Sequence, residues 1–450
     1  MVLPRPQKQQ DAWSRLSPAE KLEARWAAAL DPGTPFVSPQ AEADYRARVT
    51  RLKKAWTLDG LPDRVPVCVL SNFFPFFWAG LTPYEAMYDG PRAADAWIRC
   101  NRELQMDHAA GMLPPAGAAL DILEPKSFSW PGHGLSKRST CQCNEAEWML
   151  ADEYDDLISD PTGFLFEVYL PRIADSLSGF ARHGAIGDVL QLYSTPYYLL
   201  TWGLPEMRAS VERLSAAGRE VLAWLGLQSQ AIDTSRSEGV PLLVGGIAMT
   251  PFDFIGDTLR GTRQVCMDMY RRPDKLRAAA EKLVPVLLRW LNRNTTPESP
   301  PVVVVPLHKG TDRFMSDEQF REFYWPSLRQ YLEGVRRAGL MAYVMAEGSY
   351  STRLELFAEL EPGTIIWHFD QTDLREAKDV LAGIACVQGN VPHSLLQLGT
   401  PQQVTACCRD LIDRVAPGGG YVLDAGAALD EAQGANVRAM IQAAKDFGVY

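Results

Sequence analysis

Two residues of this sequence could carry acid–base chemistry because of their types and their positions. Glu347 follows an apolar run at 340–346 and precedes Gly348, and His308 follows the β-branched run at 302–305. An imidazole can exchange a proton near neutral pH, and a carboxylate beside it can stabilise the cation or act as a base. Unlike environments separate the pKa values of such a pair into an acid and a base. The pair is therefore a candidate catalytic centre.

The elements that must position this pair are alternating strands and helices. Six apolar or β-branched runs between residues 240 and 423 alternate with helical patterns, which is typical of parallel strands joined by helices. In barrels of this kind the carboxyl ends of the strands open onto the active site. The ionisable residues that follow these runs are Asp253, Asp257, His308, Lys309, Asp312, Glu347, Asp370, His393 and Asp424. We expect them to converge on one face of the molecule.

We divide this constellation by role. The residues assigned to catalysis are Asp257, His308 and Glu347. Those assigned to substrate binding are Asp253, Lys309 and Asp424. An isolated charge in a partly apolar pocket is costly, so we expect Glu347 to be partnered by His308, by Lys309 or by a hard metal ion that His308 and Glu347 hold. The alternative is that Glu347 only caps the helix that begins near Ser351.

The segment 72–90 is crowded with aromatic residues and follows the first strong strand pattern, at 62–70. Two interpretations are open, because large pockets and cores use the same residue types. The segment either packs into the core or forms an apolar lid over a planar substrate. In the second case the additional substrate-binding residues are Asn72, Phe73, Phe76 and Trp78.

Composition and charge exclude several classes of protein. The net charge of −10 and the pI near 5.3 argue against nucleic-acid binding, which needs a basic stripe that the short clusters at 51–54 and 271–272 do not provide. No apolar run approaches the roughly 20 residues of a membrane span. The N-terminus lacks the apolar core of a secretory signal. We therefore expect a cytoplasmic protein that binds a small molecule and neither nucleic acid nor membranes.

The eight cysteines contribute one short motif, Cys141-Gln142-Cys143. A zinc site of the usual kind needs a second cysteine pair or histidines at a set spacing, and no such partner follows nearby. We interpret the motif as a detail of the long irregular segment 110–144. Loops of this length inside compact domains are usually functional or mobile.

The chain divides into two parts in this interpretation. Residues 1–60 have charged helical patterns and predict a helical arm packed outside the rest of the protein. Residues 61–450 carry the strand and helix alternation, with a long insertion around 110–235. Their length fits one α/β barrel with insertions.

Two stretches in the second half resemble the uroporphyrinogen decarboxylase superfamily. They are GIAMTPFDFIGDTLRG from Gly246 and the C-terminal region from Gly399, which contains GTPQQV and LIDRVAPGGGYVLDAGAALDEAQ. This superfamily includes porphyrinogen decarboxylases and zinc-dependent methyltransferases that move methyl groups between corrinoids and thiols. The resemblance covers residues 66–450 and implies a (β/α)8 TIM-type barrel that forms a homodimer.

The sequence departs from the catalytic patterns of both groups and is similar to a divergent subgroup. The decarboxylases carry an arginine-rich motif where this chain reads SNFFPFF at 71–77, and their catalytic tyrosine and histidine correspond to Asp257 and Ala427. The zinc ligands of the methyltransferases correspond to Met345, Glu347 and Ala427. We therefore expect neither a tetra-acidic porphyrinogen substrate nor a thiol-activating zinc ion.

Fold does not fix function, and three hypotheses remain. The first is a lyase that cleaves or decarboxylates a small, largely apolar, aromatic substrate by acid–base chemistry and requires no cofactor. The second is a methyltransferase that demethylates a methoxylated or methylated small molecule together with a corrinoid protein, with zinc or another divalent metal at His308 and Glu347. The third is a barrel that binds a ligand without catalysis. The retained acid–base residues and the missing zinc ligands favour the lyase.

Overall fold

The computed structural model of the chain describes residues 13–182, 193 and 195–450. At its centre lies a sheet of six parallel strands, in which each strand pairs with its neighbours in the sequence. Helical crossovers return the chain to the same end of the sheet each time, which makes the strands parallel. The strands are β4 (Val244–Ile247), β5 (Val302–Leu307), β6 (Met341–Ala346), β7 (Ile365–Phe369), β8 (Cys386–Val391) and β9 (Tyr421–Ala425).

Two extended segments complete the ring of strands. The backbone of Leu423 in β9 exchanges hydrogen bonds of 2.9 and 3.0 Å with the segment 66–68. The amide of Asp107 donates a hydrogen bond of 3.0 Å to the carbonyl of Val67 in this segment. The amide of Ala109 donates one of 2.9 Å to the carbonyl of Pro241, just before β4. The sheet thereby closes into a barrel with eight strand positions.

His108 stabilises this closure of the barrel through hydrogen bonds. Its Nε2 accepts hydrogen bonds from the amides of Leu243 at 2.9 Å and Val244 at 3.2 Å, and its Nδ1 lies 2.7 Å from the carbonyl oxygen of Ala109. Burial lowers the pKa of His108 to about 4. The ring therefore stays neutral at physiological pH, with Nδ1 as the donor and Nε2 as the acceptor.

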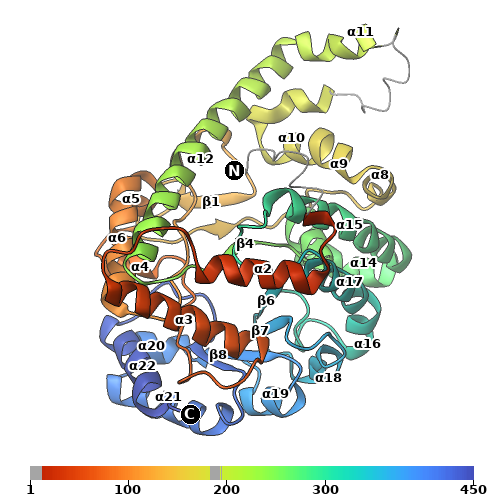
Figure 1. The fold of residues 1–450 in the computed structure, drawn as a ribbon. Coiled ribbons are helices and arrows are strands. Elements are labelled where there is room, and N and C mark those ends of the chain that lie inside the picture. The colour runs from red at the N-terminus through yellow and green to blue at the C-terminus, as the bar shows by residue number, and fades with distance from the viewer. Residues whose placement is uncertain (1–12, 183–192, 194) are drawn as a thin grey trace.

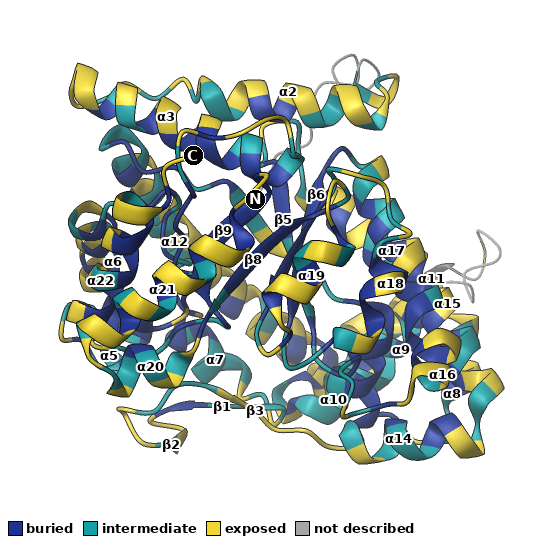
Figure 2. Ribbon diagram, turned by 90° about the horizontal axis from the view of Figure 1, so that it is seen from below, coloured by how far each residue is buried: buried dark blue, intermediate teal, exposed yellow. Residues whose placement is uncertain are grey.

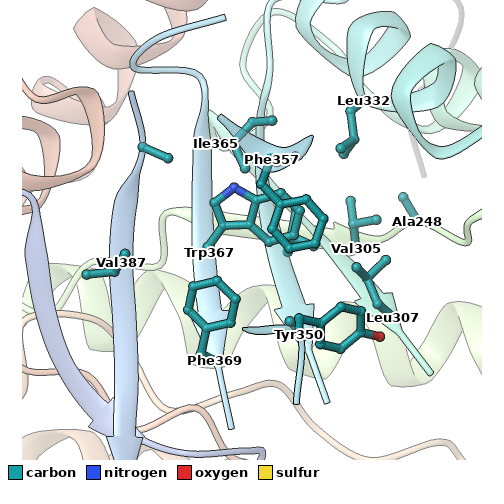
Figure 3. Packing of buried hydrophobic residues seen from close by; sticks show 14 of the residues in the cluster. Ala248, Val305, Leu307, Leu332, Tyr350, Phe357, Ile365, Trp367, Phe369 and Val387 are labelled. Carbon is teal, nitrogen blue, oxygen red and sulfur yellow. The ribbon is translucent and has the colours of Figure 1, made fainter. Parts of the chain in front are cut away.

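The strands are largely apolar because both faces of most of the sheet are covered. The polar exceptions are His368 in β7, Gln388 and Asn390 in β8 and Asp424 in β9. All residues of β6 and β7 are buried. On the outer face, Trp367 of β7 stacks on Phe357 of α18 with ring centroids 3.8 Å apart. Figure 3 shows Phe369 and Tyr350 beside this pair. These contacts join the sheet to the helical layer.

The helices of the second half surround the sheet (Figure 1). They are α13 (Pro251–Asp253), α14 (Thr262–Arg271), α15 (Pro273–Asn294), α16 (Asp317–Gln319), α17 (Trp325–Arg337), α18 (Leu354–Phe357), α19 (Leu374–Val380), α20 (His393–Leu398), α21 (Pro401–Val415) and α22 (Gly434–Phe447). Two π-helical turns, η5 (Phe254–Arg260) and η6 (Phe320–Tyr324), follow α13 and α16, and the 3-10 turn η7 (Ser351–Arg353) precedes α18. The turn η5 occupies the loop after β4 and therefore lies near the expected site.

A largely helical region precedes β4. Its elements are α4 (Phe74–Trp78), α5 (Pro83–Tyr88), α6 (Gly90–Leu104), α7 (Gly117–Leu123), β1 (Phe128–Pro131), β2 (Gly134–Leu135), β3 (Gln142–Cys143), α8 (Tyr154–Ser159), α9 (Pro161–Phe164), η1 (Leu165–Tyr169), α10 (Leu170–Ile173), η2 (Asp175–Arg182), α11 (Thr195–Tyr198), η4 (Leu199–Gly203) and α12 (Pro205–Ser237). The helix α12 is 33 residues long, contacts α6 and α7, and extends beyond the barrel in Figure 1. No helix in the described ranges has the length and apolar character needed to cross a membrane.

Two N-terminal helices close one end of the barrel: α2 (Pro18–Leu30) and α3 (Pro39–Thr57). Ser17 and Ser38 cap their first turns, and a proline occupies the first helical position of each, a combination that favours helix initiation. Figure 2 shows both helices at the end opposite β1, β2 and β3, with exposed outer faces. Trp56 points inward and donates a hydrogen bond of 3.2 Å to Gln388 of β8.

The predicted (β/α)8 barrel is confirmed. Its six regular strands overlap the predicted runs, and β5, β8 and β9 end one or two residues beyond them. The first strand pattern, at 62–70, takes part in the barrel through single backbone bridges instead of a long ladder. Of the segments assigned to the arm and the insertion, residues 1–12, 183–192 and 194 lie outside the described residues.

We predict that Asp107 is a main source of stability at the closure. It is fully buried and accepts hydrogen bonds from Arg51 at 2.5 Å, Arg64 at 2.8 Å and the amide of Val67 at 2.8 Å. Asp107→Asn leaves two guanidinium groups without their buried counter-charge, and the free energy of unfolding should fall by about 3–5 kcal/mol in chemical denaturation. Asp63→Asn is the control, because Asp63 contacts the same Arg51 from a 63% exposed position and should cost under about 1 kcal/mol. Equal losses would contradict the prediction.

Candidate functional site

Asp257 and His308 form the central contact of the site. Asp257 lies on η5 after β4, and His308 follows β5. Their Oδ2 and Nδ1 atoms are 2.6 Å apart. π-helical turns are rare in proteins as a whole, and those that occur are often at functional sites. Here the turn directs Asp257 toward the end of the neighbouring strand. The contact orients the ring of His308 and leaves its Nε2 free.

Asp253 holds the turn that carries His308. It is fully buried and accepts hydrogen bonds from the amides of His308 at 3.2 Å and Lys309 at 2.9 Å, from the hydroxyl of Thr250 at 2.8 Å, and from Tyr324. Four donors saturate this carboxylate. The assignment of Asp253 to substrate binding is therefore wrong, and the residue instead positions the backbone of the site.

Lys309 is also committed to protein partners. Its side chain is buried and forms ion pairs with Asp257 and, at 3.0 Å, with Glu145. Gly256 makes room for it, because a Cβ at that position would lie 2.6 Å from the Lys309 side chain. The assignment of Lys309 to substrate binding is thus wrong, and Lys309 is not the partner of Glu347.

Glu347 lies at the carboxyl end of β6, next to this cluster. Its Oε2 is 3.9 Å from Nε2 of His308, and its side chain is 45% exposed. The following residue, Gly348, has φ +88° and donates its amide to Asp370 at 3.2 Å. This left-handed conformation favours glycine and turns the chain so that Glu347 faces His308.

The helix-capping alternative for Glu347 is not supported. The turn η7 begins after Tyr350, and in the described structure no side chain caps it. His308 is thus the partner that the structure provides for Glu347. This agrees with the expectation that a carboxylate in a partly apolar pocket needs an opposite charge.

The surrounding charges control the protonation of the site. Burial favours the neutral form of His308, but its hydrogen bond to Asp257 and the charges of Asp253, Asp257 and Glu347 outweigh burial and raise its pKa to about 9. Burial also acts to raise the pKa of Asp257, but His308 and Lys309 lower it. Burial raises the pKa of Glu347. His308 therefore carries a proton at neutral pH and is an acid in the resting site.

A cavity of about 770 Å³ lies beside Glu347. Much of its apolar wall comes from the loop 111–116, from α7 and from α12, where Trp224 donates a hydrogen bond of 2.8 Å to the carbonyl of Pro114. Val221 and Leu225 of α12 line the cavity and remain partly exposed, so the wall reaches the molecular surface. This volume lies within the range of small-molecule pockets, about 300–1,000 Å³.

The floor of the cavity is polar. Asp424 is fully buried and accepts hydrogen bonds from the amides of Leu70 at 3.0 Å and Ala425 at 2.7 Å and from Gln388 at 2.7 Å. Gln388 also donates to the hydroxyl of Tyr343 at 3.0 Å. Asp424 thus lies in the lining, and its contact with a substrate stays a prediction.

The aromatic segment 73–78 does not form a lid. Asn72 and Phe73 line the cavity, and their contact with a substrate stays a prediction. Phe76 is fully buried in the core, and Trp78 lies under the guanidinium of Arg438, 4.8 Å from the ring centroid. Neither belongs to the lining, so their assignment to substrate binding is wrong. Phe76 thus packs in the core, and Trp78 packs against Gly434 and Arg438 of α22.

His308 and Glu347 do not supply the donor set of a zinc site. Zinc in proteins is held by four protein ligands, or by three with one open position. Here only two ligands are offered, Nε2 of His308 and the carboxylate of Glu347, because Nδ1 of His308 bonds Asp257. Across the described ranges, no group of three or more His, Cys, Asp or Glu side chains is arranged to hold a metal ion.

Comparisons with known proteins identify the family. Residues 205–447, more than half of the chain, match the family model described as uroporphyrinogen decarboxylase (URO-D). The chain belongs to the uroporphyrinogen decarboxylase family. The match begins at the first residue of α12 and includes β4 to β9, so it contains Asp257, His308 and Glu347.

Two individual proteins are similar to this family member. The uroporphyrinogen decarboxylase of Anaeromyxobacter dehalogenans (strain 2CP-C) is 27% identical over 225 residues, which are 49% of this chain and 62% of the relative. The match thus spans less than two thirds of that relative. A methyltransferase from Methanosarcina mazei is similar in structure, with a TM-score of 0.56 and 14% identity over 88% of this chain and 98% of the other. At this identity the likeness shows the fold alone.

Several residues of the site escaped sequence reasoning. Glu145 comes from the irregular segment after β3, and Tyr324 comes from η6. Neither follows a strand of the barrel, so no local signal marks them. Asp430 lines the cavity five residues after β9. Its position near the end of the last strand is the signal that could have identified it.

We predict that His308 is protonated at neutral pH. In ¹H–¹⁵N NMR of the imidazole rings, His308 should titrate near pH 9. In Asp257→Asn, the hydrogen bond to a carboxylate is lost and burial again favours the neutral ring, so its pKa should move toward the ordinary value of 6.5. His108 is the internal control and should stay neutral down to about pH 4 in both proteins. Titration of wild-type His308 at or below 6.5 would contradict the prediction.

The proton on His308 should also stabilise the fold in a pH-dependent way. Its pKa of about 9 in the folded protein exceeds the value of about 6.5 in an unfolded chain, so the folded state binds this proton more tightly. The stabilisation is fully present below about pH 6.5 and is lost as pH rises through 9. The free-energy difference between wild type and His308→Gln should therefore shrink between pH 6 and 10 in denaturant titrations. A difference that grows with pH would contradict this sign.

Proposed function

We propose that this member of the uroporphyrinogen decarboxylase family is a lyase that acts on a small, largely apolar, aromatic substrate by proton transfer. The observation that carries the proposal is the array of Asp257, His308 and Glu347, with separations of 2.6 and 3.9 Å, in which Glu347 lines the cavity. A positioned acid beside an apolar pocket is what the protonation of a carbon centre requires.

His308 is the general acid in the proposed reaction. Its Nδ1 is held by Asp257 and its pKa is about 9, so a proton on Nε2 is available at neutral pH. When the bond between the substrate and its carboxylate breaks, carbon dioxide leaves and the electron pair stays on the substrate carbon. Nε2 then donates its proton to that carbon. The partly exposed carboxylate of Glu347 takes a proton from water and passes it to the neutral ring, a role that its raised pKa favours.

The lining supports a substrate with few negative charges. No Lys or Arg side chain of the described residues lines the cavity. A single reacting carboxylate can pair with protonated His308 next to Glu347, but several carboxylates would lack counter-charges. This supports a substrate unlike the tetra-acidic porphyrinogens.

A second candidate is methyl transfer from a methoxylated compound to a reduced corrinoid carried by a partner protein. The same lack of Lys and Arg in the described lining favours it, because a methyl ether is neutral and needs no counter-charge. The carbon–oxygen bond would break, the methyl group would pass to the corrinoid, and His308 would give its proton to the leaving oxygen. The chemistry of the chain's own residues is thus shared by both candidates.

The test is turnover on a panel of aromatic acids and methoxyarenes. Release of carbon dioxide, with deuterium from D₂O at the vacated carbon, supports the lyase, whereas demethylation that needs a corrinoid protein supports methyl transfer. His308→Gln and Glu347→Gln should each lower turnover by about 10²–10⁴-fold, the usual contribution of a general acid or base. The melting temperature of Glu347→Gln should stay nearly unchanged or rise, because the variant removes a partly buried charge.

Glu359→Gln is the matched control for Glu347→Gln. The two glutamates have the same side-chain exposure of 45%, and Glu359 pairs with Arg329 at 3.2 Å outside the cavity lining. Its turnover should equal that of wild type. A Glu347→Gln enzyme with full turnover and a lower melting temperature would show that Glu347 is structural and would overturn the proposed mechanism.

A further inference from the structure

The cavity has an unbalanced charge. Its lining contains three carboxylates, Glu347, Asp424 and Asp430, and no basic side chain from the described part of the chain other than the neutral His108. Burial raises the pKa of each of the three carboxyl groups, which is the response of acids in an apolar environment without sufficient counter-charge. A ligand that carries positive charge would reduce this imbalance.

The three acids differ in their free acceptor capacity. Asp424 already accepts three hydrogen bonds, and Glu347 faces His308. Asp430 accepts one hydrogen bond from within the described ranges, at 3.0 Å from the amide of Phe73. A carboxylate can accept about four. Asp430 is therefore the acid of the lining that has the most capacity for a ligand.

Ser71 provides a second unmet group at the same place. Its side chain is 3% exposed, and its hydroxyl has no hydrogen-bond partner among the described residues. The backbone of Ser71 pairs with Leu429, the residue before Asp430, and both Ser71 and Asp430 line the cavity. A buried hydroxyl without a partner costs free energy. This corner of the cavity therefore fits a polar group of a ligand.

The corner of Ser71 and Asp430 is separate from the acid–base centre. Asp430 follows β9 and Glu347 follows β6, and β7 and β8 lie between these strands in the sheet. In a barrel of eight positions, three steps along the sheet lead most of the way to the opposite side. A ligand that contacts both places spans the cavity.

We infer that Asp430 and Ser71 bind a positively charged nitrogen, so that the substrate is an organic ammonium compound with an apolar body. The inference rests on the proposed function, because it leaves the reacting end of the substrate at His308 and Glu347. An ammonium group can donate to both the carboxylate and the hydroxyl oxygen, and Phe73 in the same lining offers an aromatic ring to the cation. The apolar body would contact the loop 111–116 and α12.

The test is the binding of two matched probes, 4-phenylbutylammonium and 4-phenylbutanol, measured by isothermal titration calorimetry on the full chain. Both have the same apolar body, and only the first carries a charge. The ammonium probe should bind about tenfold tighter, the advantage of a hydrogen bond to a charged group. In Asp430→Asn the ratio of the two affinities should fall to about one, while the alcohol still binds. The amide oxygen of Asn can still accept from Phe73, which preserves the local fold.

Two further variants make the result specific. Glu431→Gln removes the same charge from the next, exposed residue, and Glu347→Gln removes it from the reacting end; both should keep the preference for ammonium. The inference would be overturned if wild type bound the two probes with equal affinity, or if the preference for ammonium survived in Asp430→Asn. It would also be overturned if Glu347→Gln, and not Asp430→Asn, lost that preference. The experiment measures binding and not turnover. The ammonium site can therefore fail this test while proton transfer by His308 stands, and proton transfer can fail its own test while the ammonium site stands.

Discussion

The hydrogen bond between Asp257 and His308 is the interaction on which the site depends. It joins the loops after β4 and β5, two neighbouring strands. Burial by itself would keep His308 neutral, and the carboxylate reverses this preference and makes the ring a cation that faces Glu347. Lys309 offsets the charge of Asp257 from the other side. The protonation state of the site is thus decided at two adjacent strand ends.

The charged centre and the apolar cavity come from different parts of the chain. The segments that follow β4, β5 and β6 supply Asp257, His308 and Glu347, whereas α7, α12 and the loop 111–116 supply much of the wall. Strand ends are held by the hydrogen bonds of the sheet and place charges accurately. Inserted helices have fewer such constraints, so the shape of the pocket can change while the barrel is retained. This division is consistent with a family in which one fold supports different substrates.

The closure of the barrel shows which strand positions local sequence patterns can predict and which they cannot. The six strands β4 to β9 follow from their apolar runs, because parallel strands covered on both faces must be largely apolar. The position of 65–70 was also predicted, from the strand pattern at 62–70, but the position of 107–110 is not evident in this way. His108 and Asp107 complete them through single hydrogen bonds and ion pairs with residues far away in the chain. Such contacts leave no periodic pattern in the sequence.

The sequence by itself determined the barrel and the set of charged residues at the carboxyl ends of its strands, because hydrophobic periodicity and strand ends are local properties. It also identified His308 and Glu347 as neighbours. The tertiary structure alone decided what each side chain does. Asp253 and Lys309 turned inward to protein partners, Phe76 packed into the core, and the partly buried Trp78 packed under Arg438. It also brought Asp430 and Ser71 into one corner of the cavity. The direction of a side chain and its partners depend on contacts distant in sequence, and these exist only in the folded chain.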